Sequence, residues 1–414
     1  MLPKDWKTLR LSDIAKISSG GTPSRDTPSY WNGDIPWVRT TEVQNCHIHP
    51  EDIQEHISQH GLENSSAKIV AANSILLAMI GQGKTRGQVA LLRLNAATNQ
   101  NCAAITLNKD QCPDFYFQQL LSKYQSIRDL SNSAGQSNLS GALVKSIEVI
   151  APPLHEQTKI AKILSTWDKA ITTTERLLAN SQQQKQALTW QLLTGKNRFA
   201  GFSDTWGKQK LSEISTRIQE KTDGEAHPIL TISSLSGFVT QEERYSRYMA
   251  GESVNNYILL SRGEFAYNKG NSKTYQYGCI FKLDTFDTGL VPHVYVCFKL
   301  NQGFDPEYYA QLFAADYLKD QLAGLVNTGV RNNGLLNIKP SAFLDTTVPV
   351  PPLAEQQKIA QVLSTADAEI SNLQAQLAKL KLEKKALMQQ LLTGQRRVRL
   401  DDELEEEPQI RRVG

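Results

Sequence analysis

The sequence consists of two copies of one unit, and this repeat limits the possible folds more than any other feature. PPLHEQTKIAKILSTWDKAI begins at Pro152 and PPLAEQQKIAQVLSTADAEI begins at Pro351, an offset of 199 residues. The same offset holds without a gap to QLLTGKNR (191–198) and QLLTGQRR (390–397). An offset of 200 residues aligns WKTLRLSDI near the start with WGKQKLSEI in the middle. The repeat predicts a pseudo-two-fold chain whose units each have about 150 residues of mixed structure and then about 45 regular residues.

The regular part of each copy has the spacing of a long helix. Apolar residues recur at alternating intervals of four and three, which is typical of the a/d seam of a coiled coil. The seam comprises Ile160, Leu164, Trp167, Ile171, Leu178, Leu188 and Leu192, and then Ile359, Leu363, Ile370, Leu377, Leu387 and Leu391. Lys185 and Lys384 interrupt it at matching places. Pro-Pro precedes each helix and Thr-Gly follows it, as expected of start and stop signals.

Pairing of the two helices is the favoured arrangement. Because a whole domain separates them, the simplest closed arrangement is antiparallel, with one globular domain at each end. The alternative is two independent helices, each packed on its own domain.

The remaining segments predict a mixed α/β fold in both copies. We expect strands at 35–40, 74–80, 88–94 and 102–107 and a helix at 113–130, then strands at 227–235, 263–270, 278–283 and 294–300 and a helix at 305–325. The expected organisation is a first globular domain (1–150), a central helical spacer (151–199), a second globular domain (200–350), a distal helical spacer (351–399) and an acidic, disordered tail (400–414).

Composition narrows the class of protein. The net charge is +3, but residues 401–414 hold six acids and two arginines, so the rest of the chain is at +7. This excess of positive charge is compatible with basic patches on domains whose positive and negative charges otherwise balance. No apolar run is long enough to span a membrane. Five scattered cysteines without a C-x-x-C pair fit reduced thiols, so we expect a cytoplasmic protein.

Gly83-Lys84-Thr85 looks like the end of a phosphate-binding loop, but its context is wrong. The loop motif needs a glycine at position 78, which is Ala78, and a helix after the lysine. The segment that follows, RGQVALLRL, has the pattern of a strand, so we expect a hairpin and no ATP site. The second copy repeats a strand, a polar turn and a strand in AYNKGNSKTYQYGCIFKL.

Both polar turns are equipped to contact DNA. Asn and Gln can bond an adenine edge, and Arg and Lys can bond guanine or phosphate. The alternative is a solvated hairpin tip, which favours the same residue types. The candidate DNA contacts are Arg25, Arg39, Thr40, Gln82, Lys84, Thr85, Arg86, Gln88, Asn99, Gln100, Gln136 and Asn138 in the first copy, and Asn268, Lys269, Asn271, Lys273, Thr274, Tyr275, Gln276, Arg331, Asn332 and Asn333 in the second.

Other motifs favour structural roles. Cys46, His47 and His49 suggest a metal site, but no fourth ligand stands at a suitable spacing, so packing is the better interpretation. Trp31 and Trp37 could stack on bases, although core packing is the commoner role of tryptophan. We predict no catalytic, cofactor or metal site in this chain.

Two dissimilar domains that alternate with near-identical PPL-x-EQ…LLTG helices resemble the specificity subunit of type I restriction–modification systems. YWNGDIPWVRTTEV (30–43) and LLAMIGQGKTRGQVALL (76–92) are similar to segments of the target-recognition domains of that family. The second domain has no counterpart of the first of these segments, and its identification rests on order and position.

The resemblance implies a non-catalytic subunit of a multisubunit adenine-N6 methyltransferase and restriction endonuclease. Each recognition domain would read half of a bipartite double-stranded DNA target, and the helices would set the unread gap. Two modification subunits carrying S-adenosylmethionine would dock on the helices, and restriction subunits would add ATP- and Mg-dependent cleavage. The remaining alternatives are a self-contained DNA methyltransferase or nuclease and a coiled-coil scaffold that binds only proteins. The double prolines lack the Asn and the aromatic residue of an adenine methyltransferase motif, which speaks against the enzyme.

Overall fold

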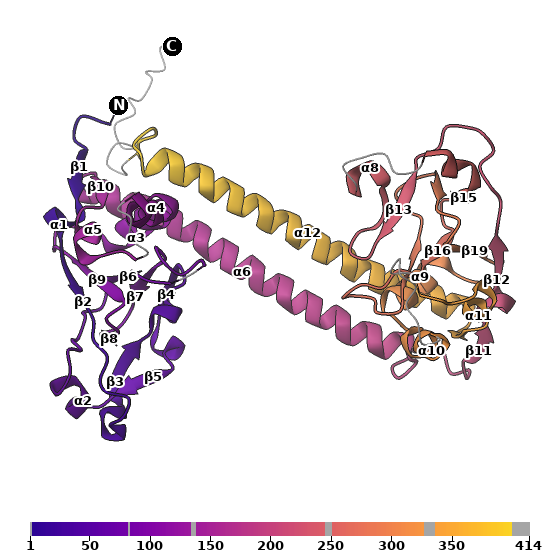
Figure 1. The fold of residues 1–414 in the computed structure, drawn as a ribbon, viewed down its shortest axis with the longest axis horizontal. Coiled ribbons are helices and arrows are strands. Elements are labelled where there is room, and N and C mark those ends of the chain that lie inside the picture. The colour runs from indigo at the N-terminus through magenta and orange to yellow at the C-terminus, as the bar shows by residue number, and fades with distance from the viewer. Residues whose placement is uncertain (1, 82, 134–137, 245–250, 327–335, 400–414) are drawn as a thin grey trace, which may run out of the picture. The chain divides into compact units, whose positions relative to one another are not determined.

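A computed structural model describes residues 2–81, 83–133, 138–244, 251–326 and 336–399 (Figure 1). None of the helices in these ranges has the length and hydropathy of a membrane span. Gln82, Gln136, Arg331, Asn332, Asn333 and the acidic tail, all named in the sequence predictions, lie outside the described residues.

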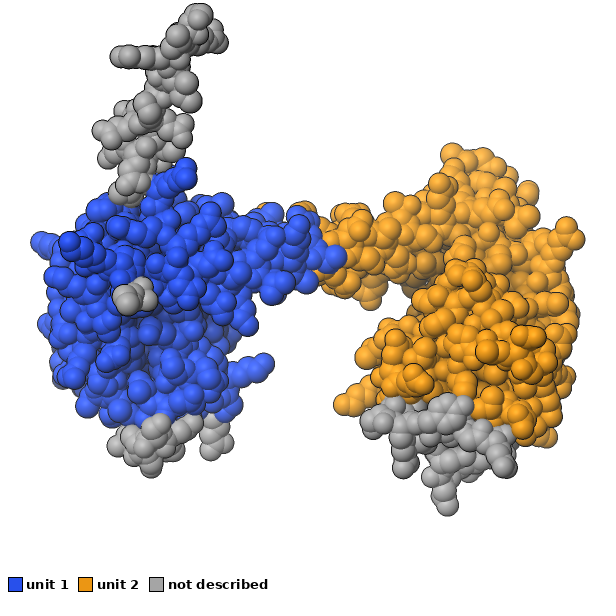
Figure 2. All heavy atoms as spheres, turned by 90° about the horizontal axis from the view of Figure 1, so that it is seen from above, with its two compact units in different colours: residues 1–175, 375–414 blue, residues 176–374 orange. Residues whose placement is uncertain are grey.

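The chain forms two compact units (Figure 2). Unit 1 comprises residues 1–175 and 375–414, and unit 2 comprises residues 176–374. The division cuts each of the two long helices, α6 (Leu154–Leu193) and α12 (Leu353–Leu391), once. Each unit therefore contains one globular domain and part of both long helices, as the pseudo-two-fold repeat predicts.

Unit 1 is built on a five-stranded sheet of order β2-β9-β6-β7-β4 and a three-stranded sheet of order β5-β3-β8. Its elements are β1 (Lys7–Arg10), α1 (Leu11–Ile14), β2 (Ala15–Ser19), η1 (Pro28–Tyr30), β3 (Trp31–Val38), η2 (Thr40–Glu42), β4 (Cys46–Ile48), η3 (Pro50–Asp52), β5 (Glu55–Ile57), α2 (Gln59–Glu63), β6 (Ile75–Ala78), β7 (Val89–Leu92), β8 (Ala97–Thr98), β9 (Cys102–Leu107), α3 (Pro113–Ser122), α4 (Tyr124–Ser133), α5 (Gly141–Lys145) and β10 (Glu148–Ala151). The antiparallel pair β1–β10 joins the start of the domain to the segment that enters α6.

Unit 2 is built on a four-stranded sheet of order β12-β19-β16-β17 and on three further two-stranded pairs. Its elements are β11 (Gly207–Lys210), α7 (Leu211–Ile214), β12 (Ser215–Ile218), β13 (Leu230–Ser233), β14 (Gly237–Thr240), α8 (Gln241–Arg244), η4 (Gly251–Asn256), β15 (Ile258–Ser261), β16 (Phe265–Asn268), β17 (Cys279–Lys282), β18 (Thr288–Val291), β19 (Val296–Leu300), α9 (Pro306–Ala314), α10 (Lys319–Leu325), α11 (Pro340–Leu344) and β20 (Thr347–Val350). The pair β11–β20 matches β1–β10 of unit 1.

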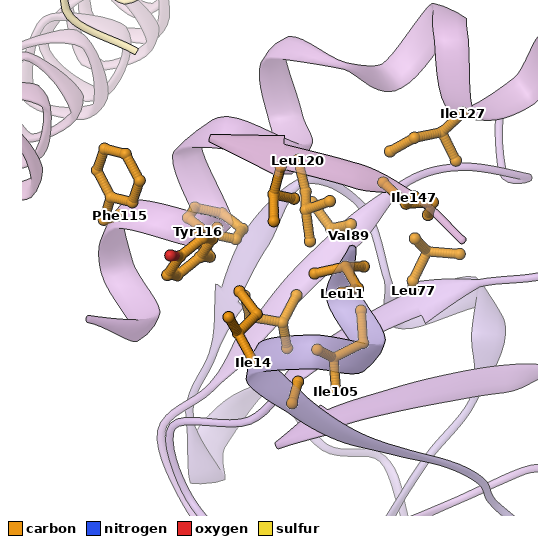
Figure 3. Close-up of a cluster of buried hydrophobic side chains, with 14 of the residues drawn as sticks. Leu11, Ile14, Leu77, Val89, Ile105, Phe115, Tyr116, Leu120, Ile127 and Ile147 are labelled. Atoms are coloured by element: carbon orange, nitrogen blue, oxygen red, sulfur yellow. The ribbon is translucent and has the colours of Figure 1, made fainter. Parts of the chain in front are cut away.

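The core of unit 1 contains buried side chains from the sheet, from α3 and from both long helices. Figure 3 shows the part of this core that the sheet and α3 form. Leu77 and Val89 on the sheet and Tyr116 on α3 belong to the same buried cluster as Ile160 of α6 and Leu391 of α12. Burial of such side chains contributes roughly 1.5–3 kcal/mol each. The domain and the two helix segments are thus one packed body.

Unit 2 has the same plan with a more aromatic core. The rings of Phe265 and Phe298 stack with centroids 5.3 Å apart, and those of Tyr267 and Phe343 stack at 4.3 Å. The end of α6 and the start of α12 complete this cluster.

The long helices run antiparallel within each unit, as predicted. In unit 1, Lys384 pairs with Asp168 and Lys381 with Glu175, so the residue numbers fall along α12 as they rise along α6. In unit 2 the corresponding contacts are Ser181–Glu369 and Lys185–Asp367.

The helices expected at 113–130 and 305–325 are each broken in two. Lys123 leaves the helical conformation (φ −94°, ψ 8°), which separates α3 from α4. Asp316, with φ 54°, lies in the left-handed region between α9 and α10. The apolar spacing continues across both breaks because the second helix still packs on the core, so the spacing alone did not reveal them.

Candidate nucleic-acid interface

Loops from distant parts of the sequence gather at one end of the unit 1 sheet. Ala78, the last residue of β6, pairs with Cys102, the first residue of β9. β2 ends and β7 begins at this same end. The loops 20–30, 79–88 and 98–101 therefore lie together, because neighbouring antiparallel strands place alternate connections at one end of a sheet. These loops contain most of the predicted DNA contacts of the first domain.

The loop 79–88 is the turn of an antiparallel hairpin, as predicted, and α4 holds it through the loop's backbone. The hydroxyl of Tyr124 donates to the carbonyl oxygen of Lys84 at 2.6 Å, and Nη1 of Arg128 donates to that of Arg86 at 2.8 Å. Gly87 adopts φ 87°, which favours glycine. The exposed side chain of Lys84 is thereby presented on a fixed backbone, while Thr85, Arg86 and Gln88 are half-buried.

Three predicted DNA contacts of the first domain, Thr40, Asn99 and Gln100, also form hydrogen bonds within the domain. The hydroxyl of Thr40, a buried residue, donates to Oδ1 of Asn99 at 2.8 Å. The hydroxyl of Thr22 donates to Oε1 of Gln100 at 2.5 Å, which leaves the amide nitrogen of Gln100 as a donor. Asn138 is exposed. Thr40 thus bonds within the domain, whereas the amide nitrogens of Asn99 and Gln100 and the exposed Asn138 remain for a ligand.

Arg25 and Arg39 share one carboxylate. Arg25 donates to Oε2 of Glu55 at 2.6 Å, and Arg39 donates to Oε1 of Glu55 at 3.2 Å. Arg39 also pairs with Glu42 at 3.2 Å. The guanidinium of Arg25 lies 3.7 Å from the centroid of Trp31. Both arginines are therefore neutralised within the domain, and contact with DNA would have to compete with these ion pairs.

The aromatic and metal-like motifs of the first domain have structural roles here. Trp37 is buried and donates to the carbonyl oxygen of Gly21 at 3.0 Å, so it helps to shape the loop 20–30. His47 packs against Phe117 with ring centroids 5.0 Å apart, and burial lowers its pKa below the ordinary value. Within the described ranges no group of three or more His, Cys, Asp and Glu side chains is arranged to hold a metal ion.

Unit 2 places its polar hairpin in the same position. Asn268, the last residue of β16, pairs with Cys279, the first residue of β17. The hydroxyl of Tyr275 donates to the carbonyl oxygen of Ala314 at 3.2 Å, and burial raises its pKa, so the hydroxyl remains a donor. The predicted contacts divide into two groups. Asn268 and Lys269 bond to the domain itself, and Asn271, Lys273, Thr274 and Gln276 are exposed.

The repeated Glu-Gln motif fastens each globular domain to one long helix. In unit 2, Oε1 of Gln356 accepts from the backbone N–H of Asp305 at 2.9 Å, and Nε2 donates to the carbonyl oxygen of Pro351 at 2.8 Å. Gln157 makes the matching bonds in unit 1, to Cys112 at 2.9 Å and to Pro152 at 2.8 Å. Asp305 and Cys112 are the N-cap residues of α9 and α3, so the glutamine ties the start of a domain helix to the start of a long helix.

The glutamate of the motif binds the segment that follows the other long helix. Glu355 is fully buried and accepts from Nε of Arg198 at 2.6 Å and from Nε1 of Trp206 at 2.9 Å. The hydrogen bond to Glu355 raises the pKa of Arg198. Glu156 accepts from Arg397 at 2.5 Å in the same way. The segment after each Thr-Gly therefore returns to the start of the other helix.

A third repeated contact was not foreseen from the sequence. Asp168 on α6 accepts from Nε2 of the buried Gln118 at 2.6 Å and from Nζ of Lys384 on α12 at 2.5 Å. In unit 2, Asp367 accepts from Gln311 at 2.8 Å and from Lys185. The lysines that interrupt the apolar seam thus link the helix pair to the globular domain of each unit. The signal was present in PDFYFQ and PEYYAQ, which place a glutamine at the same position of α3 and α9.

The seam residues divide by position along the helices. Those near the helix ends, Ile160, Leu164, Leu192, Ile359, Leu363 and Leu391, are buried in the domain cores. The remaining seam residues, Trp167, Ile171, Leu178, Leu188, Ile370, Leu377 and Leu387, are half-buried. Apolar side chains outside the seam are the most exposed on the helices, with Leu382 69 % and Trp190 56 % exposed.

Comparisons with known proteins agree with this architecture. The chain is 28 % identical to the MjaIX specificity subunit of Methanocaldococcus jannaschii over 45 % of this chain and 42 % of that subunit. It is 23 % identical to the MjaVIII specificity subunit of the same organism over 96 % of this chain and 94 % of that subunit. The crystal structure of a type I restriction–modification S subunit from M. genitalium has the same fold, with a TM-score of 0.59 and 15 % identity over 95 % of this chain and 98 % of the other.

The family model described as "Type I restriction modification DNA specificity domain" matches residues 3–180 and 204–382, one match for each copy of the repeat. Together with the two-domain, two-helix architecture, these matches place the chain in the family of type I restriction–modification DNA specificity subunits.

Proposed function

We propose that this specificity subunit reads a bipartite double-stranded DNA target, one half with each recognition domain. The observation that carries the proposal is the repeated sheet end. Each unit presents a polar hairpin, at 79–88 and at 269–278, that the domain holds through the backbone or through a tyrosine hydroxyl. Lys84 and Lys273 are exposed on these hairpins. Because phosphate contacts give affinity and base contacts give specificity, a fixed polar loop can supply both.

The recognition domains in this proposal are residues 1–150 and 200–350, and the helical spacers are 151–199 and 351–399. The helices fix the number of unread base pairs between the two half-sites. Two modification subunits dock on the helices and supply adenine methylation with S-adenosylmethionine. Restriction subunits supply ATP- and Mg-dependent translocation and cleavage. The exposed Leu382 and Trp190 support docking on helix faces outside the buried seam. The chain itself performs no chemistry.

A domain exchange tests this function. We expect replacement of residues 1–150 by the equivalent domain of a relative to change one half of the methylated motif and to leave the other half and the gap unchanged. Methylome sequencing of a strain that expresses the exchanged subunit with the modification subunits measures this result. The reciprocal exchange of residues 200–350 is the matched control and should change only the other half. A folded variant that changes both halves, or neither, would show that the domains do not read separately.

A further inference from the structure

A polar hollow of about 470 Å³ opens in unit 1 beside the loop end of the five-stranded sheet. Its walls come from the last residues of β2, from Met79 at the start of the hairpin loop, and from Gln100. Lys68 and Lys145 complete it. The hollow therefore adjoins the loops to which the proposed function assigns DNA contact, although neither lysine was among the predicted contacts.

The charge of this hollow is positive and uncompensated. Its lining contains two lysines and no carboxylate. Both lysines are exposed, and within the described part of the chain neither forms an ion pair. Arg25 and Arg39, by contrast, are neutralised by Glu55 and Glu42. The positive charge available to an anion in this region therefore includes the two lysines of the hollow as well as the exposed Lys84.

The charged groups in the hollow are donors only, and the hydroxyls of Ser18 and Ser19 can donate as well as accept. Lysine has three donor hydrogens and no acceptor. Oε1 of Gln100 accepts from Thr22, and the amide nitrogen is the donor of Gln100 that remains for a ligand. In the major groove adenine and cytosine require an acceptor from the protein, whereas guanine and thymine, like a phosphate diester, offer acceptors only. Donors without a neighbouring carboxylate therefore fit a phosphate at any position of the DNA, but only two of the four bases.

We propose that this hollow binds a phosphate of the DNA backbone, with Lys68, Lys145 and Gln100 as the donors. The inference rests on the proposed function and adds a specific anchor to it. The hollow positions the strand, and the adjacent hairpin with Lys84 then lies against the grooves. Phosphate contacts fix the register of a protein on DNA without selecting its sequence.

The salt dependence of DNA binding tests the proposal in the full complex. Dissociation constants are measured for Lys68→Ala and Lys145→Ala, with the modification subunits present, on a duplex that carries the methylated motif. A lost phosphate contact lowers the slope of log K against log salt by about 0.9. We expect that decrease for each lysine, an unchanged methylated motif, and wild-type behaviour for Lys145→Arg. Lys7→Ala is the matched control, because Lys7 is an exposed lysine of unit 1 on β1, outside the hollow.

The possible results distinguish failure of the phosphate site in the hollow from failure of the proposed DNA-reading function. Slopes equal to that of the Lys7 control would overturn the proposal, and a changed motif would show that the hollow reads a base. Gln100→Leu gives a second measurement, since loss of a neutral donor should weaken binding with little change in slope. If the wild-type complex itself does not distinguish matched from scrambled duplex, the proposed function fails and not only the phosphate site.

Discussion

Gln356→Leu tests whether the repeated Glu-Gln motif stabilises the junction between the globular domain and the long helix. The substitution keeps a side chain of similar size at a buried position but removes both hydrogen bonds. The carbonyl oxygen of Pro351 is then buried without a partner, and the N–H of Asp305 loses its acceptor at the N-cap of α9.

The expected loss follows from these two groups. An unsatisfied buried backbone group costs about 1–3 kcal/mol, and the half-buried Asp305 should fall at the low end. The total is about 2–4 kcal/mol. For a unit of this size, each kcal/mol shifts Tm by about 2–4 °C, so Tm should fall by roughly 4–16 °C.

Thermal unfolding followed by circular dichroism measures the change. Gln357→Leu is the matched control, because the neighbouring glutamine is exposed and should shift Tm by no more than a degree or two. Gln157→Leu should repeat the loss in unit 1, where the same bonds are formed. Equal melting curves for Gln356→Leu and Gln357→Leu would refute the assignment of the motif as a structural junction.

Three further results are expected. Asp168→Ala should destabilise unit 1 by about 1–3 kcal/mol, because Gln118 and Lys384 lose their shared acceptor. Addition of Gln118→Leu should recover part of this loss in thermal unfolding, and purely additive effects would argue against an energetic coupling of Asp168 with Gln118. Insertion of seven residues after Gln184 and seven after Glu383 keeps the apolar face and both lysine junctions and should lengthen the helices by about 10 Å. The methylated motif should then gain about three unread base pairs, with weaker binding. An unchanged gap in an assembled complex would show that helix length does not set the number of unread base pairs. Lys84→Ala should lower the slope of log K against log salt by about 1 if the side chain contacts phosphate, or reduce discrimination between bases by about 1–3 kcal/mol at one position of the motif if it reads a base. Dissociation constants for matched and scrambled duplexes at several salt concentrations distinguish these results, and wild-type behaviour would show that the loop does not contact DNA through Lys84.

Features with a strong local or periodic signal were predictable from the sequence. The repeat, the long helices and the strand that follows Gly83-Lys84-Thr85 all depended on residues within one segment or on an exact offset. The hairpin around Lys84 followed from the strand pattern on both of its sides, and the pairing of β6 with β7 confirms it.

Contacts between distant segments were not predictable in the same way. Arg397 and Glu156 are 241 residues apart, and no local pattern indicates that they pair. A polar residue in a loop looks the same whether it faces a ligand or its own domain. Thr40 and Asn99 illustrate this, since each has the residue type of a DNA contact but bonds to the other. Lys68 and Lys145 carried no motif, and only the fold placed them in one hollow.

The division of both long helices between the two units has a consequence for synthesis on the ribosome. Unit 2 is continuous in sequence, whereas the core of unit 1 includes Leu391, the last residue of α12, and Leu392, which follows it. Domains usually fold in order of emergence, at about 5–20 residues per second. Here the first domain to emerge must wait for more than 200 further residues, roughly 10–40 s at these rates. The second unit therefore closes first, and the nascent first unit exposes the apolar surface around Ile160 and Leu164 until the last helix arrives.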